Sequence, residues 1–159
     1  MTSSPARTTP AAAPVPTVNS HGALCQARAV AAGVLPDAAC TPGATNPDVT
    51  QATISSAICR TGYTATIRPP ASYTAALKRQ QIVAYGYTYT NPRDYEEDHL
   101  IALELGGAPS DQRNLWPQPG HSPNPKDKVE DGLHQRVCAS SLSLAQAQQR
   151  IASDWTTAG

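Results

Sequence analysis

The sequence predicts one domain of the α+β class, and three observations lead to this prediction. The chain has 159 residues, a length typical of a single domain. Residues 95–105 and 114–116 have the apolar character of two short strands, and two adjacent glycines lie in the segment that joins them. Segments with helical spacing lie on either side of this pair. The core must be modest, because the hydrophobic fraction is 40%, phenylalanine is absent and 15 residues are proline.

The first 20 residues differ from the rest of the chain. They are mostly Ala, Pro, Thr and Ser, with almost no charge or large apolar side chain. Such a segment cannot bury enough surface to offset its ordering entropy. We therefore expect residues 1–20 to be a disordered linker and residues 21–159 to form the domain. No signal peptide and no membrane-spanning run is recognisable, so an exported form is expected to have lost a leader.

Between residues 23 and 86 the pattern predicts mainly helices. An alanine-rich helix covers residues 23–32. A second helix starts at Asn46-Pro47, because Asn suits the cap and Pro the first helical position. The alternating residues 63–67 predict a short extended segment that two prolines halt. A third helix begins at residue 72 or 74, runs to residue 84 or 85 and stops at Gly86.

The second half of the chain predicts a hairpin followed by two helices. Residues 95–105 form the first strand, residues 106–113 the connecting loop and residues 114–116 the second strand. Prolines then forbid regular structure until Asn124-Pro125, which starts a helix. Ser143 and Gln146 make a capping box for the last helix. The apolar residues expected to face the core from these two helices are Val129, Leu133, Val137, Leu144, Ala147, Ile151 and Trp155.

The four cysteines, Cys25, Cys40, Cys59 and Cys138, have no C-x-x-C spacing, which argues against a zinc knuckle. Their even number and wide spacing in a core-poor chain favour two disulfides formed in an oxidising compartment. Three pairings are possible. The favoured one joins Cys25 to Cys40, closing a short loop, and Cys59 to Cys138, tying the N-terminal half to the helix after the hairpin. The alternative is four free thiols in a cytosolic protein.

The net charge is zero and the pI is near 6.9, so any site for a polyanion must be local. Between Arg60 and Arg93 the chain has five basic residues and no acid. A cationic surface of this kind would neutralise phosphates without reading sequence. The residues predicted to contact nucleic acid are Arg68, Lys78, Arg79, Arg93, Arg113, Lys126 and Lys128.

Asp98 and His99 carry the clearest chemical signal. Neighbours on a strand point to opposite faces, so the backbone must be irregular there, or one residue must act indirectly, for both to serve one site. Histidine has a pKa suited to a general base near neutral pH. Asp98 and Asn124 offer oxygen atoms to a hard divalent ion. A lone histidine on an apolar strand is more often structural, and Asn124 is equally well explained as a helix cap.

This arrangement resembles the HNH endonucleases of the ββα-metal (His-Me finger) superfamily. Their consensus reads Asp-His-x-x-Pro-Leu-x-x-Gly-Gly, then Asn-Leu, then a helix with His or Asn. The matching stretches are 98–107 and Asn114-Leu115, with Asn124 in the third position and Ala102 in place of the usual proline. Small secreted bacterial HNH nucleases share a wider pattern that covers about residues 40–156. Its further elements are Ile58-Cys59, Ile67-Arg68-Pro69-Pro70, Tyr95-Glu96-Glu97, Trp116-Pro117, Lys126-Asp127, Leu133-His134 and Val137-Cys138.

The resemblance implies a ββα-metal core at about residues 94–139 and a secreted or envelope-associated DNase with little sequence preference. His99 would activate water and Asn114 would hold the His99 ring by bonding the backbone across the loop. Asp98 and Asn124 would bind Mg²⁺, with Mn²⁺ or Ca²⁺ possible. Double-stranded DNA would be the main substrate, and RNA is a further candidate substrate. We expect a monomer without membrane contact.

Several residues and functions remain as alternatives. Glu97 could join the metal through water, and His121 is a rival third ligand. His134 is expected to be a surface or structural residue, and Trp116 is expected to pack in the core, with stacking on a base as the alternative. A glycan hydrolase that uses two of the carboxylates near residue 98 would need no metal and would survive loss of His99. A non-catalytic, disulfide-stabilised envelope module would be affected neither by EDTA nor by His99→Ala.

Overall fold

The computed structural model describes residues 25–159, so the predicted linker lies outside the described residues. The described chain is a mixed α+β structure with two antiparallel hairpins and four helices, which confirms the predicted class. The strands are β1 (Arg28–Val30), β2 (Gly33–Leu35), β3 (Tyr95–His99) and β4 (Leu115–Pro119); the helices are α1 (Tyr63–Ile67), α2 (Ala71–Ala84), α3 (Pro125–Cys138) and α4 (Leu144–Asp154).

The centre of the molecule is the succession β3, β4, α3. The two strands pair with His99 opposite Leu115 and Tyr95 opposite Pro119. The prediction that prolines forbid regular structure after residue 116 is wrong, because Pro117 and Pro119 lie within β4. Both prolines lie in non-hydrogen-bonded pairs of the β3–β4 ladder. A backbone N–H at these positions would point away from β3, so its absence in proline costs no ladder bond. The outward carbonyl groups of β4 are bound from outside the sheet instead: Gln81 Nε2 donates to Leu115 O at 2.7 Å.

The helices were predicted better in the second half of the chain than in the first. The predicted bounds of α2, α3 and α4 agree with the structure to within a few residues. Asn124 and Ser143 both cap their helices in complete capping boxes. The four apolar residues predicted to face inward from the last helix are all buried, although Trp155 belongs to a 3₁₀ turn, Trp155–Thr157.

Three predictions in the first half are wrong. The alanine-rich segment forms the β1–β2 hairpin, because Trp155 covers Gly33 and donates from Nε1 to Val34 O at 2.9 Å. No helix follows Asn46, which is buried and whose N–H donates to Gly106 O at 2.8 Å. Thr53 there bonds nearby backbone groups, in competition with a helix. Residues 63–67 form the short helix α1 instead of an extended segment.

Two disulfides hold the core, with the pairing that the sequence favoured. The short-range disulfide joins Cys25 to Cys40 and the long-range disulfide joins Cys59 to Cys138, across 15 and 79 residues. Together they indicate folding in an oxidising compartment. None of the helices within residues 25–159 is long and apolar enough to cross a membrane.

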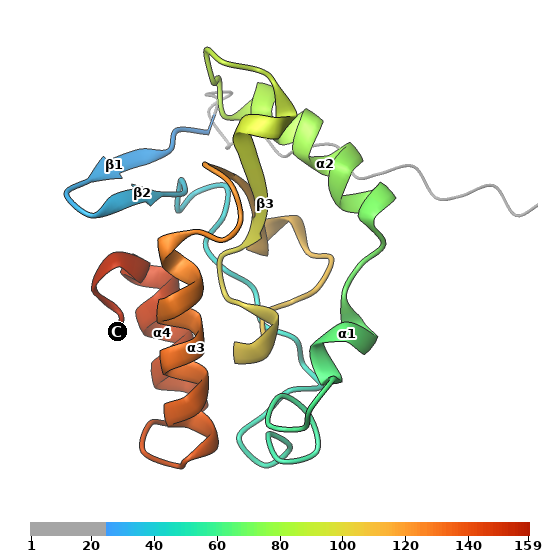
Figure 1. Cartoon of the computed structure of the whole chain (residues 1–159), viewed down its shortest axis with the longest axis vertical. Helices are drawn as coiled ribbons and strands as arrows, with labels where there is room; N and C mark the ends of the chain where they lie inside the picture. Colours follow the sequence, from blue (N-terminus) through green and yellow to red (C-terminus); the bar gives the residue numbers. More distant parts are fainter. Residues whose placement is uncertain (1–24) are drawn as a thin grey trace, which may run out of the picture.

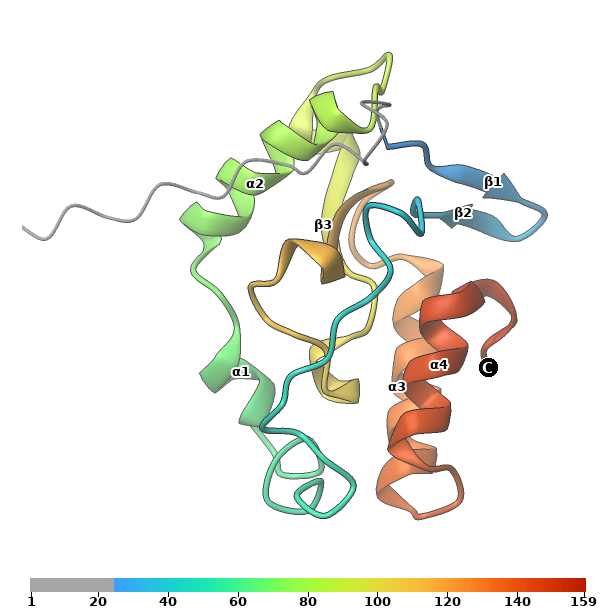
Figure 2. The same ribbon diagram turned by 180° about the vertical axis from the view of Figure 1, so that it is seen from behind.

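Figure 1 shows how these elements frame the central strand. α3 and α4 lie side by side on one flank of β3, and α1 and α2 lie on the other. The reverse view in Figure 2 shows the same arrangement, with the β1–β2 hairpin above α4. The main core lies among the chain after β2, the 3₁₀ turn Leu103–Leu105, α3 and α4. Among the described residues β3 pairs with β4 alone, and carbonyl groups on its second edge accept hydrogen bonds from Lys78 of α2 at 2.9 Å and Lys126 of α3 at 2.8 Å.

Candidate functional site

An open cleft of about 340 Å³ lies along the unpaired edge of β3, between α1 and α3. One wall carries Thr64 and Arg68 from α1 and its end, and another carries residues of α3. Asp98 and His99 both line this cleft. The sequence suggested that neighbouring strand residues could not share a site without irregular backbone. They share it here because β3 is an edge strand, and side chains from both of its faces reach the space beside the edge.

The cleft is strongly acidic. Arg68 is the only Lys or Arg side chain among the described residues that line it. The carboxyl groups that line it are those of Glu96, Glu97, Asp98, Glu104, Asp127, Glu130 and Asp131. A phosphate would be repelled from such a surface unless cations neutralised part of the charge.

His99 is held by one ring nitrogen. Its Nε2 lies 2.8 Å from Pro109 O. A carbonyl oxygen can only accept a hydrogen bond, so Nε2 carries the proton and Nδ1 of the neutral ring carries a lone pair. Burial lowers the pKa of His99 below its ordinary value of 6.5, and the Pro109 carbonyl and Asp98 oppose this effect. The neutral ring, with one oriented basic nitrogen, therefore prevails at neutral pH.

Asn114 fixes the loop that carries Pro109. Its Oδ1 accepts from the N–H of Ile101 at 2.9 Å, and its Nδ2 donates to the carbonyl oxygens of Ile101 at 2.9 Å and Ala108 at 3.1 Å. The side chain is fully buried. These bonds turn the chain after His99, so the predicted strand over 95–105 ends at His99. Gly107 is required, because a Cβ there would lie 1.7 Å from Ile101 O.

Asp98 is bound by nitrogen donors. Trp116 Nε1 donates to its Oδ2 at 3.0 Å, and the ammonium group of Lys126 lies 3.0 Å from Oδ2 and 3.2 Å from Oδ1. Lys126 also donates to Glu130 Oε1 at 2.5 Å and to His99 O at 2.8 Å. Burial alone would lower the pKa of Lys126, but the charges of Asp98 and Glu130 raise it above its ordinary value. Burial raises the pKa of Glu130, against the effect of Lys126.

Asn124 does not meet Asp98 in this cleft. Its Oδ1 accepts from the N–H of Lys126 at 2.8 Å, which makes it the cap of α3. Its Nδ2 donates to Glu96, and its own N–H donates to Asp127 Oδ2 at 3.0 Å. The predicted ligand pair Asp98 and Asn124 therefore does not fit a divalent ion, since their oxygens already have other partners. Asn124 instead brings two cleft carboxylates, those of Glu96 and Asp127, to its own side chain and backbone.

Glu97 is the cleft residue whose carboxyl group lacks hydrogen-bond partners. Neither carboxyl oxygen has a hydrogen-bond partner, although both are buried. Burial raises the pKa of Glu97 to about 9, with Lys78 opposing the rise. A buried polar group without a partner is costly, and a hard cation is one partner that would relieve it. Glu97 is thus the cleft residue with unused capacity to bind a cation, although no three cleft carboxylates among the described residues bring their oxygens within 4.8 Å of one another.

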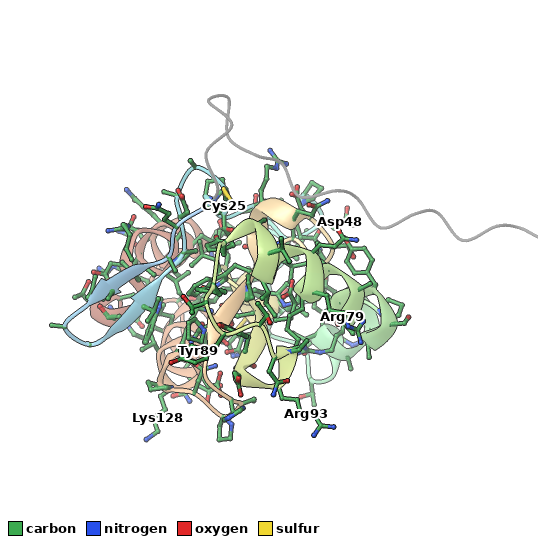
Figure 3. All side chains as sticks on the ribbon, turned by 90° about the horizontal axis from the view of Figure 1, so that it is seen from above. Cys25, Asp48, Arg79, Tyr89, Arg93 and Lys128 are labelled. Atoms are coloured by element: carbon green, nitrogen blue, oxygen red, sulfur yellow. A yellow bond between two sulfur atoms is a disulfide. The ribbon has the colours of Figure 1, made fainter. Side chains whose placement is uncertain are left out.

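The residues predicted to contact nucleic acid are placed very differently from one another. Lys126 is fully buried, so its assignment to a phosphate-binding surface is wrong. Lys78 is half-buried and donates to Tyr95 O at 2.9 Å. Arg113 pairs with Asp111 at 2.6 Å and is exposed. The others, Arg68, Arg79, Arg93 and Lys128, are exposed, and Figure 3 shows Arg93 and Lys128 pointing outward on the same side of the molecule.

Two further groups of metal-binding residue types lie outside the cleft. His121 lines a separate cleft with Asn124. Among the described residues, ligand atoms of Cys59, His134 and Cys138 lie within 4.8 Å of one another. This geometry would suit a metal, but the two sulfurs are bonded to each other in the long-range disulfide. His134 is held by Ile58 O at 2.9 Å and serves a structural purpose there.

Sequence reasoning missed the part that Lys126 and Glu130 play in this site. Their i, i+4 spacing on a helix is a signal for an ion pair, but nothing in the pattern placed that pair against Asp98. Trp116 was correctly placed in the core, where it is fully buried. No protein-family model, no curated protein and no solved structure matches this chain.

Proposed function

We propose that the protein is an exported, divalent-metal-dependent phosphodiesterase that cleaves DNA with little sequence preference, in the manner of HNH endonucleases. The observation that carries the proposal is the state of His99. The ring is neutral, its Nε2 proton is bound by Pro109 O, and it lines an acidic cleft beside a ββα hairpin and helix. A fixed tautomer with one basic nitrogen is what general-base chemistry requires.

In the proposed reaction His99 Nδ1 takes a proton from the attacking water. The imidazolium that forms keeps its Nε2–H bond to Pro109 O, which favours the positive charge. Asn114 holds the loop that supplies this carbonyl, through bonds to Ile101 and Ala108. Arg68, at the end of α1, is the cleft cation available to a phosphate oxygen. No sequence readout is needed for these contacts, because they involve only water and the phosphodiester.

A divalent ion would neutralise phosphate charge and assist departure of the leaving oxygen. Within the cleft, Glu97 is the residue that would hold it. Glu97 has two buried oxygens without hydrogen-bond partners, whereas oxygens of Glu96 and Asp127 already accept hydrogen bonds from Asn124. A site with one carboxylate ligand would leave the other positions to water and phosphate, in keeping with the few carboxylates and several waters that Mg²⁺ usually takes.

A plasmid-nicking assay tests the proposal. Wild-type protein is compared with and without EDTA, and beside His99→Ala. His121→Ala is the matched control, because His121 is exposed and lines a different cleft. We expect nicking by the wild type and by His121→Ala, and none after EDTA treatment or in His99→Ala. Loss of general-base catalysis costs about 10² to 10⁴ in rate.

The same assay distinguishes the rival functions. A carboxylate-pair glycan hydrolase would leave plasmid intact, and its activity on glycans would survive both EDTA and His99→Ala. A non-catalytic binding module would nick nothing under any condition. Nicking that persists in His99→Ala, with the variant folded as judged by circular dichroism, would refute the role given to His99.

A further inference from the structure

Lys126 places a buried positive charge against groups that belong to residues of the candidate site. Its side chain has no solvent exposure, although lysine is almost never fully buried without a partner. Three oxygen groups surround the ammonium: the Asp98 carboxylate at 3.0 and 3.2 Å, the His99 carbonyl at 2.8 Å and Glu130 Oε1 at 2.5 Å. An ammonium has three protons, so these three groups saturate its donors.

The surroundings of this ammonium have the composition of a hard-cation site. The shell consists of two carboxylates and one backbone carbonyl, the oxygen ligands that Ca²⁺ takes in proteins. The groups come from β3 and from α3, so the cation joins the edge strand to the helix, and Asp98, His99 and Glu130 also line the cleft. Asp98 gains a further bond from Trp116 Nε1 at 3.0 Å. All of these contacts form within the protein.

We propose that the Lys126 ammonium is a built-in cation that occupies the position beside Asp98 where the HNH resemblance implies a divalent ion. Asp98, the His99 backbone and Glu130 are then organised by the chain itself, before any metal binds. A divalent ion required for activity would bind elsewhere in the cleft. This inference rests on the contacts of Lys126 and holds whether or not the protein cleaves DNA.

The inference is tested by removing the ammonium and offering Ca²⁺ in its place. Lys126→Ala deletes the charge and leaves space for an ion among the three oxygen groups. Lys126→Met deletes the charge but fills the space with an apolar chain of similar length. Thermal unfolding is measured for both variants and the wild type, in EDTA and in millimolar CaCl₂. DNA is absent, so the result is independent of nuclease activity.

We expect Ca²⁺ to raise the Tm of Lys126→Ala by several degrees more than that of the wild type or of Lys126→Met. A ligand that binds only the folded state stabilises it in this way. Adding Asp98→Asn and Glu130→Gln to Lys126→Ala should abolish the additional shift, because the ligands lose their charge. An equal Ca²⁺ shift in Lys126→Ala and wild type would overturn the inference.

Lys126→Ala could be unfolded in EDTA, since it leaves two buried carboxylates without their cation. The variant is therefore also refolded from urea with CaCl₂ or with EDTA, and native near-ultraviolet circular dichroism is recorded. Recovery of the native spectrum in CaCl₂ alone supports the inference. Failure to refold in both solutions contradicts it, because a cation position that accepts only the lysine is a structural ion pair and nothing more.

Discussion

Glu97→Gln should make the protein more stable above neutral pH, although Glu97 lines the candidate site. The folded protein holds the Glu97 proton up to a pKa of about 9, and the ordinary value is 4.5. Between these values the unfolded chain has released its proton and the folded protein has not. The ionisation of Glu97 therefore does not reduce the free energy of unfolding below pH 4.5, and reduces it progressively as the pH rises toward 9.

The size of the effect follows from the same shift. One pKa unit corresponds to about 1.4 kcal/mol, so the ceiling at pH 8 is about 5 kcal/mol. Glutamine has nearly the same shape and cannot ionise, so Glu97→Gln removes this loss. We expect it to exceed the wild type in free energy of unfolding by at least about 1 kcal/mol at pH 8, and to match it near pH 4.

Urea unfolding followed by circular dichroism at several pH values, in EDTA, measures this difference. Asp48→Asn is the control, because Asp48 is exposed at the surface and visible there in Figure 3. Its stability should follow that of the wild type across the pH range. A Glu97→Gln variant whose stability runs parallel to that of the wild type from pH 4 to pH 9 would show that Glu97 is not desolvated in the folded protein.

Three further predictions concern the proposed base His99, the loop that Asn114 holds and the two disulfides. Because burial lowers the pKa of His99, the acid limb of kcat/KM against pH should have its midpoint below 6.5; a midpoint well above that value would contradict the neutral, buried ring. Asn114→Ala leaves buried backbone groups of Ile101 and Ala108 without partners, and should lower the free energy of unfolding in urea by about 3 kcal/mol or more. A decrease of less than about 1 kcal/mol would show that the Asn114 hydrogen bonds are dispensable for stability. Removing the long-range disulfide, which spans 79 residues, should lower the free energy of unfolding by about 4.5 kcal/mol, and removing the short-range one, which spans 15, by about 3 kcal/mol. Calorimetry of the two double Cys→Ala variants checks this order. A reversed order would exclude loop entropy as the main source of the stabilisation.

The parts of the fold that were predicted well are those with a local chemical signal. Asn124 and Ser143 carry complete capping boxes, and their helices begin where the sequence indicated. The hairpin was recognised from its apolar strands and glycine loop. The N-terminal hairpin was missed, because its conformation depends on Trp155, more than a hundred residues away. Alanine content favours a helix there, and tertiary contact overrides that preference.

The candidate site was predictable in its residue types and less so in its contacts. Asp98, His99 and Asn114 all lie where the hairpin brings them together. The assignment of Lys126 to the surface failed, because charge alone does not reveal whether a lysine faces solvent or two carboxylates. Asn124 illustrates the opposite difficulty: cap and ligand are equally good explanations of an Asn-Pro sequence, and only the contact of its Oδ1 with the N–H of Lys126 decides for the cap.

The long-range disulfide has a mechanical consequence for the cleft. Cys59 lies just before α1 and Cys138 ends α3, so the covalent bond fastens the two walls together at one end. The disulfide limits separation of α1 from α3 at that end, so any widening of the cleft is expected at the end near Ser122 and Glu96. The DNA of the proposed function would therefore enter the cleft from that end, and a thiol reductant would remove the constraint without altering Asp98, His99 or Asn114.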